Sequence, residues 1–336
     1  MNARRRSVLR AAAIVELVAV ASGAALSASL GGSDAAGLVR GGFTGAIVAA
    51  PLFMIDLVLV DPRRGRALRE LPFGAALLLR AALQVGLILV ALILAALVSG
   101  KPGGAYLTPV IVLVAIAVAL ELGFLWQVSA YLGTGSLLAL VTGRYRHPRV
   151  EELVLLFVDL AGSTSIADRL GPSRFMSLLA EIADDMSPPI SDGGGQIHRY
   201  VGDETIITWR TRNDLVDARP IETCFAMIDA VAAQDDKYDR LFGVRPAFHA
   251  ALHIGPVIIG EIGDLHREVA VLGDTMNVTA RIEAESRPMG HAVLASAKLI
   301  ERIGTLPRGI TTTDLGPIAL RGRFDPLVTL SREVPP

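Results

Sequence analysis

Two aspartates, Asp159 and Asp203, occupy positions at which folded chains can hold metal ions. Asp159 follows the apolar run 153–158, which is typical of a strand buried on both faces, so its carboxylate is expected at the rim of a sheet. Asp203 falls within 202–204, a Gly-Asp-Glu sequence that predicts a tight turn between two strands. If the fold brings both carboxylates to one rim, they can together hold two Mg²⁺ or Mn²⁺ ions.

The residues after Asp159 favour phosphate binding. Leu160, Ala161, Gly162, Ser163 and Thr164 form a turn of mostly small residues that leads into a helical stretch, 165–170. Such a turn at a helix N-terminus presents backbone N–H groups to an anion. The alternative is that the Ser and Thr here only cap the helix.

A third group of polar residues lies on one predicted helix, 275–283, with Asp274 as its N-cap. Asn277 and Arg281 are four residues apart and therefore share a helix face. The amide can orient a ribose, and the guanidinium can offset charge that develops on an α-phosphate. The alternative is an ordinary solvated helix face.

The composition divides the 336-residue chain into two unlike halves. Overall, 52% of residues are hydrophobic, 19% are charged, and the mean hydropathy is +0.50. Residues 1–150 hold 14 Lys and Arg against 6 Asp and Glu, whereas residues 151–336 hold 18 against 27. An acidic second half argues against a nucleic-acid partner, because a phosphate backbone requires a basic surface.

The first half is predicted to be an all-α membrane bundle, residues 1–127. Arginine clusters precede the first apolar stretch, separate the second from the third, and follow the fourth. The positive-inside rule therefore places both termini in the cytoplasm, with four spans in the inner (plasma) membrane. A cleaved signal peptide in place of the first span would leave the second half on the same side. The four stretches, each near the ~20 residues that a span needs, are 11–30, 42–60, 73–99 and 107–127.

Residues 128–150 are predicted to connect the two halves. Leucines among Gly and Ser give way to a Gly-Arg-Tyr-Arg-His-Pro sequence, and Pro148 should end any helix at or before His147. The segment is a signalling helix, an interfacial helix whose arginines meet anionic lipid headgroups, or both at once.

The second half resembles the catalytic domain of class III adenylyl and guanylyl cyclases over residues 151–332. The segment 247–260 also falls where that family places a core hairpin. The resemblance implies an α+β, ferredoxin-like βαββαβ fold with added strands. The ordered blocks that carry it are 157–164 (Phe-Val-Asp-Leu-Ala-Gly-Ser-Thr), 200–203 (Tyr-Val-Gly-Asp), 273–281 (Gly-Asp-Thr-Met-Asn-Val-Thr-Ala-Arg) and 320–323 (Leu-Arg-Gly-Arg).

The resemblance also implies roles for individual residues. Asp159 and Asp203, with Leu160, match the metal-binding positions, and 161–164 contact the substrate phosphates. Arg321 falls where a basic residue holds the triphosphate. Asn277 and Arg281 match the pair that acts on the transition state. The family works as a head-to-tail homodimer in which one subunit binds the metals and the other supplies this pair.

The base-reading positions depart from the family pattern. Adenylyl cyclases usually carry a Lys where this chain has Arg199, and a polar residue where it has Ala270. Nothing here matches the Glu and Cys of guanylyl cyclases, so ATP is the expected substrate. The alternatives are a guanylate cyclase or purine nucleotide cyclase of relaxed specificity, and a membrane receptor that binds nucleotide without turnover.

Three other features indicate structure rather than chemistry. Cys224 has no Cys or His motif around it, which favours an inert, packed thiol. His249 and His253 share a strand face without partners at zinc spacing. Asp184 and Asp185 are expected at the solvated end of a helix.

Overall fold

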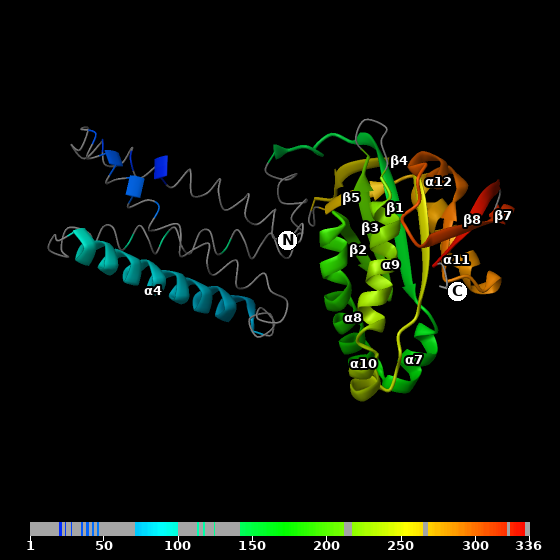
Figure 1. Ribbon diagram of the computed structural model, residues 1–336, viewed down its shortest axis with the longest axis horizontal. Helices are drawn as coiled ribbons and strands as arrows, with labels where there is room; N and C mark the ends of the chain where they lie inside the picture. Colours follow the sequence, from blue (N-terminus) through cyan, green and yellow to red (C-terminus); the bar gives the residue numbers. More distant parts are fainter. Residues whose placement is uncertain are drawn as a thin grey trace. The chain divides into compact units, whose positions relative to one another are not determined.

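The computed structural model describes residues 71–99, 142–211, 217–264, 268–320 and 323–332, together with isolated positions before residue 125. The chain divides into two compact units, 1–134 and 135–336. The first is described mainly through one helix, and the second is described almost completely (Figure 1).

The first unit contains helix α4 (Phe73–Ser99), which matches the third apolar stretch in the sequence. Within the described residues, no helix combines the length and the apolar character that a membrane crossing requires. The other three predicted spans and most of the 128–150 connector lie outside the described residues. The four-span topology therefore stays a prediction.

The second unit is built on a ferredoxin-like βαββαβ core. The strand order β2-β3-β1-β4 is antiparallel throughout, so the first and third strands of the motif are neighbours in the middle of the sheet. This arrangement confirms the expected α+β fold. The elements of the core are β1 (Arg149–Leu160), α7 (Ser163–Leu170), α8 (Pro172–Asp192), β2 (Gln196–Val201), β3 (Glu204–Arg210), α9 (Arg219–Ala232), α10 (Asp235–Phe242) and β4 (Phe248–Ile262).

Further elements extend the sheet beyond β4. A short strand, β6, pairs in parallel with β4 and antiparallel with β8, and β7 closes the far edge. Residues 248–262 form one continuous strand, whose hairpin partner is β5. These elements are β5 (Glu268–Leu272), α11 (Asp274–Met289), β6 (Val293–Ser296), α12 (Ala297–Ile303), β7 (Ile310–Leu320) and β8 (Arg323–Arg332).

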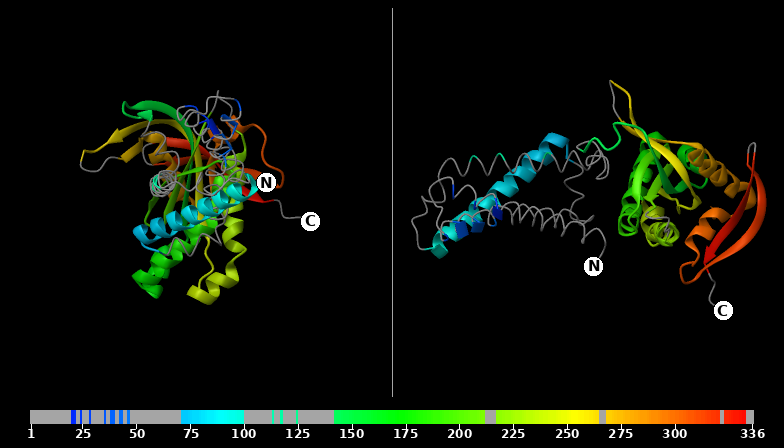
Figure 2. Two further views of the ribbon diagram at one scale, coloured as in Figure 1. Left: turned by 90° about the vertical axis from the view of Figure 1, so that its left-hand side faces the viewer. Right: turned by 90° about the horizontal axis from the view of Figure 1, so that it is seen from above.

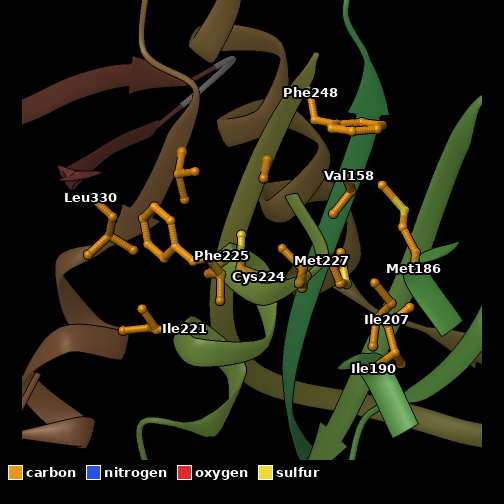
Figure 3. Packing of buried hydrophobic residues seen from close by; sticks show 14 of the residues in the cluster. Val158, Met186, Ile190, Ile207, Ile221, Cys224, Phe225, Met227, Phe248 and Leu330 are labelled. Carbon is orange, nitrogen blue, oxygen red and sulfur yellow. The ribbon is translucent and has the colours of Figure 1, made fainter. Parts of the chain in front are cut away.

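Helices α8 and α9 lie side by side and cover one face of this sheet (Figures 1 and 2). Alternate residues of β1, such as Leu156 and Val158, point to this face, because successive strand side chains point to opposite sides. They pack against an apolar stripe that includes Met186 and Ile190 of α8 (Figure 3). Cys224 of α9 lies in this core, and burial raises the pKa of its thiol to about 12, as expected for an inert thiol.

The other face of the sheet carries a smaller core. Leu155 and Phe157 of β1 pack there with Ile206 of β3, and Val269 and Val271 of β5 pack against them. The β4–β5 hairpin therefore reaches back over the central strands. This contact brings β5 close to β2, although neither strand pairs with the other in the sheet.

Two local predictions were wrong. Helix α8 continues to Asp192, so Asp185 lies inside the helix rather than at its end. Asp185 pairs with Lys237 and accepts a hydrogen bond from Tyr238 at 2.7 Å, which ties α8 to α10. The N-cap of α11 is Gly273, which has no side chain to accept a hydrogen bond from the helix N-terminus. Asp274, the predicted N-cap, is instead the first helical residue.

Candidate active site

The fold brings Asp159 and Asp203 together at one rim of the sheet. Asp159 is the second-last residue of β1, and its side chain is only 9% exposed. Asp203 lies in the two-residue turn between β2 and β3, where Gly202 adopts φ 64°, a left-handed conformation that favours glycine. The two carboxyl groups are close enough to share a hydrogen bond when one is protonated.

Burial and crowding of acidic groups make this rim electrostatically unusual. Burial, together with the nearby Asp203 and Glu283, raises the pKa of Asp159 to about 6. Burial and the same group of carboxylates raise the pKa of Glu204, the first residue of β3, to about 7. Four acidic side chains therefore repel one another here: Asp159, Asp203, Glu204 and Glu283.

One cation of the chain already lies among these carboxylates. Arg287, near the end of α11, donates a hydrogen bond from Nη2 to Oδ2 of Asp159. Glu283, one helical turn earlier, lies near enough to raise the pKa of Asp159. These two α11 residues are four apart and so share a face of the helix.

Asn277 and Arg281 lie on another face of α11. At 100° per residue, positions six apart differ by about 120° around the helix axis. Asn277 is therefore rotated by about 120° from Glu283, and Arg281 by the same angle from Arg287. Asn277 is exposed, and Arg281 is half-buried. Because the face with Glu283 and Arg287 is turned to this chain's own aspartates, Asn277 and Arg281 are directed away from those aspartates.

The turn after Asp159 has the shape expected of an anion site. The N–H of Ala161 donates to the carbonyl of Ala247 at 2.8 Å, which fixes the start of the turn. Gly162 caps α7 with φ 70°, a conformation that an L side chain rarely adopts. The helix then begins at Ser163, and Thr164 follows, so the first N–H groups of α7 have no carbonyl of an earlier helical turn to bond. This turn lies next to Asp159, as the sequence predicted.

The other predicted site positions do not all lie at the carboxylate rim. Arg199 on β2 forms an ion pair with Glu268 on β5, with Nη2 2.5 Å from Oε2. Ala270, two residues after Glu268, is buried at 5% exposure. Leu160 is also buried, so only its backbone is available for a contact with a metal ion. Arg321 lies outside the described residues.

The carboxylates fit divalent cations chemically. Oδ2 of Asp203 is buried without a hydrogen-bond partner in the described part of the chain, and carboxylate oxygens are the ligands that Mg²⁺ and Mn²⁺ prefer. Across residues 142–332, excluding the gaps, no group of three or more His, Cys, Asp and Glu is arranged to hold a metal ion alone. Asp159 and Asp203 are the side chains that would hold such ions.

His249 lies directly across the β1–β4 ladder from Asp159. Its Nδ1 is buried without a hydrogen-bond partner among the residues that the structure describes. His253 lies further along the same strand and lines a cavity of about 430 Å³ at the opposite end of α11, beside Gly255 and Thr275. The cavity is therefore remote from the carboxylates, and the two histidines do not share a site.

Sequence reasoning missed Glu204, Glu283 and Arg287 as members of the rim, and Glu268 as the partner of Arg199. A weak signal existed for α11, since Glu283 and Arg287 are spaced one turn apart on a helix already assigned to chemistry. No such signal existed for Glu268, which meets Arg199 only because the β4–β5 hairpin folds over the sheet.

The fold and the rim together define an α+β domain with paired carboxylates beside a turn of mostly small residues at a helix N-terminus. The sequence matches the family described as "Adenylate and Guanylate cyclase catalytic domain" over residues 145–330, more than half of the chain. The protein therefore belongs to this cyclase family.

Several known proteins are similar to this chain. "Adenylate cyclase 2" of Rhizobium meliloti (strain 1021) is 38% identical over 217 residues, which span 65% of this chain and 60% of that protein. "Adenylate cyclase" of Anabaena cylindrica is 25% identical over 156 residues, or 45% of this chain and 30% of that protein. A solved structure, "Structure of a bacterial light-regulated adenylyl cyclase", superposes with a TM-score of 0.53 at 19% identity and covers 61% of each chain, which shows a shared fold.

Proposed function

We propose that this protein is an adenylate cyclase that converts ATP to 3′,5′-cyclic AMP and pyrophosphate as a head-to-tail homodimer. The observation that carries the proposal is the meeting of Asp159 and Asp203 at one sheet rim, next to the anion-binding turn 160–164. The similarity to proteins named adenylate cyclase supports ATP as the substrate.

In the reaction, the ribose 3′-hydroxyl attacks the α-phosphorus and gives up its proton to solvent, and the new P–O bond forms in line with the bond that breaks to release pyrophosphate. Asp159 and Asp203 would hold two Mg²⁺ or Mn²⁺ ions, and backbone N–H groups of 162–164 would bind phosphate oxygens. When bound, such ions make the hydroxyl nucleophilic and offset the charge of the leaving group. Asn277 orients the ribose, and Arg281 offsets charge on the α-phosphate, a contribution of about 3–4 kcal/mol.

The two faces of α11 support a dimer with shared sites. Glu283 and Arg287 face the chain's own aspartates, whereas Asn277 and Arg281 lie on a different side of the helix, from which they would act on a nucleotide held by a second copy. An exposed apolar row offers a surface for that copy: Val150, Ile258 and Leu272 are direct neighbours across β1, β4 and β5, and are 72%, 47% and 55% exposed. Contiguous exposed apolar side chains of this kind mark interaction surfaces.

The proposal includes anchoring in the inner membrane through residues 1–127, with the catalytic domain in the cytoplasm. Its support is the apolar character of the first half and the alternation of its arginine clusters. Protease protection of tagged termini in intact spheroplasts tests this topology. Cleavage at either terminus in intact spheroplasts would contradict it.

The activity is tested on the full chain in detergent or nanodiscs, with ATP and Mn²⁺, by measuring cyclic AMP and pyrophosphate together. Asp159→Asn should abolish both products, whereas Asp168→Asn, a matched change on the exposed surface of α7, should leave them unchanged. Turnover equal to wild type in Asp159→Asn would refute the proposal. Wild-type protein that binds ATP without producing cyclic AMP would instead identify a nucleotide-binding receptor.

A further inference from the structure

Arg199 on β2 and Glu268 on β5 form an ion pair that the sequence alone did not predict. Arg199 occupies the position at which adenylyl cyclases usually carry a base-reading Lys, whereas the usual polar partner position is Ala270, which is buried and apolar. The ion pair spans 69 residues of sequence, from β2 to the first residue of β5. Glu268 therefore supplies, two residues earlier, the acidic group that position 270 lacks.

The strand geometry makes this substitution possible. Residues two apart on a strand point to the same side, so Glu268 and Ala270 share a face of β5. Glu268 is 36% exposed and Arg199 is 47% exposed, so both charged groups remain accessible to a ligand. An ion pair this exposed contributes little to folding stability.

We infer that Glu268 is a specificity-determining residue that, together with Arg199, reads the adenine ring. This inference rests on the proposed cyclase activity. Arg carries five N–H donors and a carboxylate has about four lone-pair sites, so each can bind the base while the pair stays intact. Arg199 would donate to N1 of adenine, and Glu268 would accept from the 6-amino group. Guanine has a carbonyl oxygen in place of the 6-amino group. That oxygen and the Glu268 carboxylate are both hydrogen-bond acceptors, so they would repel each other.

The pair also lies on the correct segment for this role. β5 ends at Leu272 and α11 begins at Asp274, so Glu268 and Asn277 belong to one continuous strand–helix segment. A nucleotide whose ribose is held by Asn277 would place its base against the same subunit. The base-reading pair and the ribose-binding residue would then come from one protomer, and the metal-binding aspartates from its partner.

The test compares ATP with purine riboside triphosphate, which lacks only the 6-amino group. For the full chain with Mn²⁺, pyrophosphate release measures kcat/KM for both nucleotides. Wild type should prefer ATP by about 10- to 100-fold, because a hydrogen bond to a charged group is lost with the analogue. Glu268→Ala should lower kcat/KM for ATP by a similar factor and leave the analogue unchanged, so the preference disappears. Glu268→Gln, which keeps one acceptor oxygen, should retain part of the preference.

Glu261→Ala is the matched control. Glu261 is an acidic residue of the same hairpin and lies on β4, opposite Val269 of β5. It should leave the preference unchanged. If Glu268 only ties β5 to β2, Glu268→Ala will lower both kcat/KM values by the same factor, and the inference is overturned. Equal use of both nucleotides by wild type also overturns it. A wild-type protein without turnover of either nucleotide refutes the cyclase proposal itself, which is a distinguishable result.

Discussion

Arg287 is the residue whose charge matters most directly to the carboxylate rim. Its guanidinium bonds Asp159, the same side chain that is proposed to bind cations. A bound divalent ion and Arg287 would therefore compete for one carboxylate. Arg287 also offsets part of the repulsion among the acidic side chains, and so it stabilises the rim while no ion is bound.

Arg287→Gln should strengthen Mn²⁺ binding in the absence of nucleotide. The expected gain is about threefold to fivefold, because partly exposed ion pairs contribute at most about 1 kcal/mol. Electron paramagnetic resonance of free Mn²⁺ measures the affinity. Arg302→Gln, which removes an arginine paired with Glu152 elsewhere in the domain, should leave the affinity unchanged. Weaker Mn²⁺ binding in Arg287→Gln would show that the arginine helps to form the site instead.

The raised pKa values of Asp159 and Glu204 predict a pH-dependent stability. Their carboxyl groups ionise near pH 6 and 7 in the folded domain, but near 3.8 and 4.5 when unfolded. Between these limits the folded state binds more protons, so the free energy of unfolding should fall as pH rises from about 4 to 7. Thermal melting in EDTA measures this trend.

Asp159→Asn is the control for that trend. It removes one of the two titrating groups, so the loss of stability with rising pH should become smaller. An unchanged pH dependence in this variant would contradict the assignment of the trend to the rim. Added Mn²⁺ should stabilise wild type most at the higher pH, where both carboxylates are ionised and available.

At the scale of elements, α11 is held on the sheet by a close approach to β4. The Thr275 hydroxyl donates to the Pro256 carbonyl, and Gly255 lies directly beneath the same side chain. A Cβ on Gly255 would lie 2.6 Å from Oγ1 of Thr275, nearer than side-chain carbons normally approach. A glycine at this position therefore sets the distance between α11 and the sheet.

Gly255→Ala should destabilise the domain by about 1–3 kcal/mol, the usual cost of overpacking. It should also lower kcat, because a displaced α11 moves Asn277, only two residues after Thr275. Urea denaturation and cyclic AMP production measure the two effects. In Gly255→Ala/Thr275→Ala the clash is removed, so the double variant should be more stable than the sum of the single changes indicates. Additive free energies would contradict the proposed contact.

For the whole molecule, the proposed reaction needs two copies of the chain for one complete site. One copy would present its own aspartates with Glu283 and Arg287, and the other would supply Asn277 and Arg281. Each head-to-tail dimer would contain two equivalent sites, since a two-fold interface uses the same surfaces on both subunits.

Mixing Asp159→Ala and Arg281→Ala chains should restore activity that neither variant has alone. About half of the randomly formed dimers are mixed, and each mixed dimer has one intact site, so recovery should approach about a quarter of wild type. Co-expression with two different affinity tags isolates the mixed dimer, which should then reach about half of wild-type activity. A mixed dimer without activity would contradict sites shared between subunits.

The local secondary structure around each candidate site residue could be predicted from the amino-acid sequence alone. The apolar run before Asp159, the Gly-Asp turn around Asp203 and the helical spacing of Asn277 and Arg281 are local patterns, and the structure has the expected β1, β2–β3 hairpin and α11. Local backbone preferences and side-chain periodicity act over a few residues, so these features are readable without a fold.

The contacts between charged groups far apart in the sequence could not be predicted, because they depend on the packing of the whole domain. Arg287 reaches Asp159 across 128 residues of sequence, and Arg199 reaches Glu268 across 69. Both contacts depend on how α11 and the β4–β5 hairpin pack on the second face of the sheet, where apolar burial rather than any polar motif sets the position. Hydrophobic burial is non-directional, so a sequence pattern does not say which charged residues it brings together. The pairing of Arg199 with Glu268, rather than with a residue at position 270, can therefore be seen only in the folded domain.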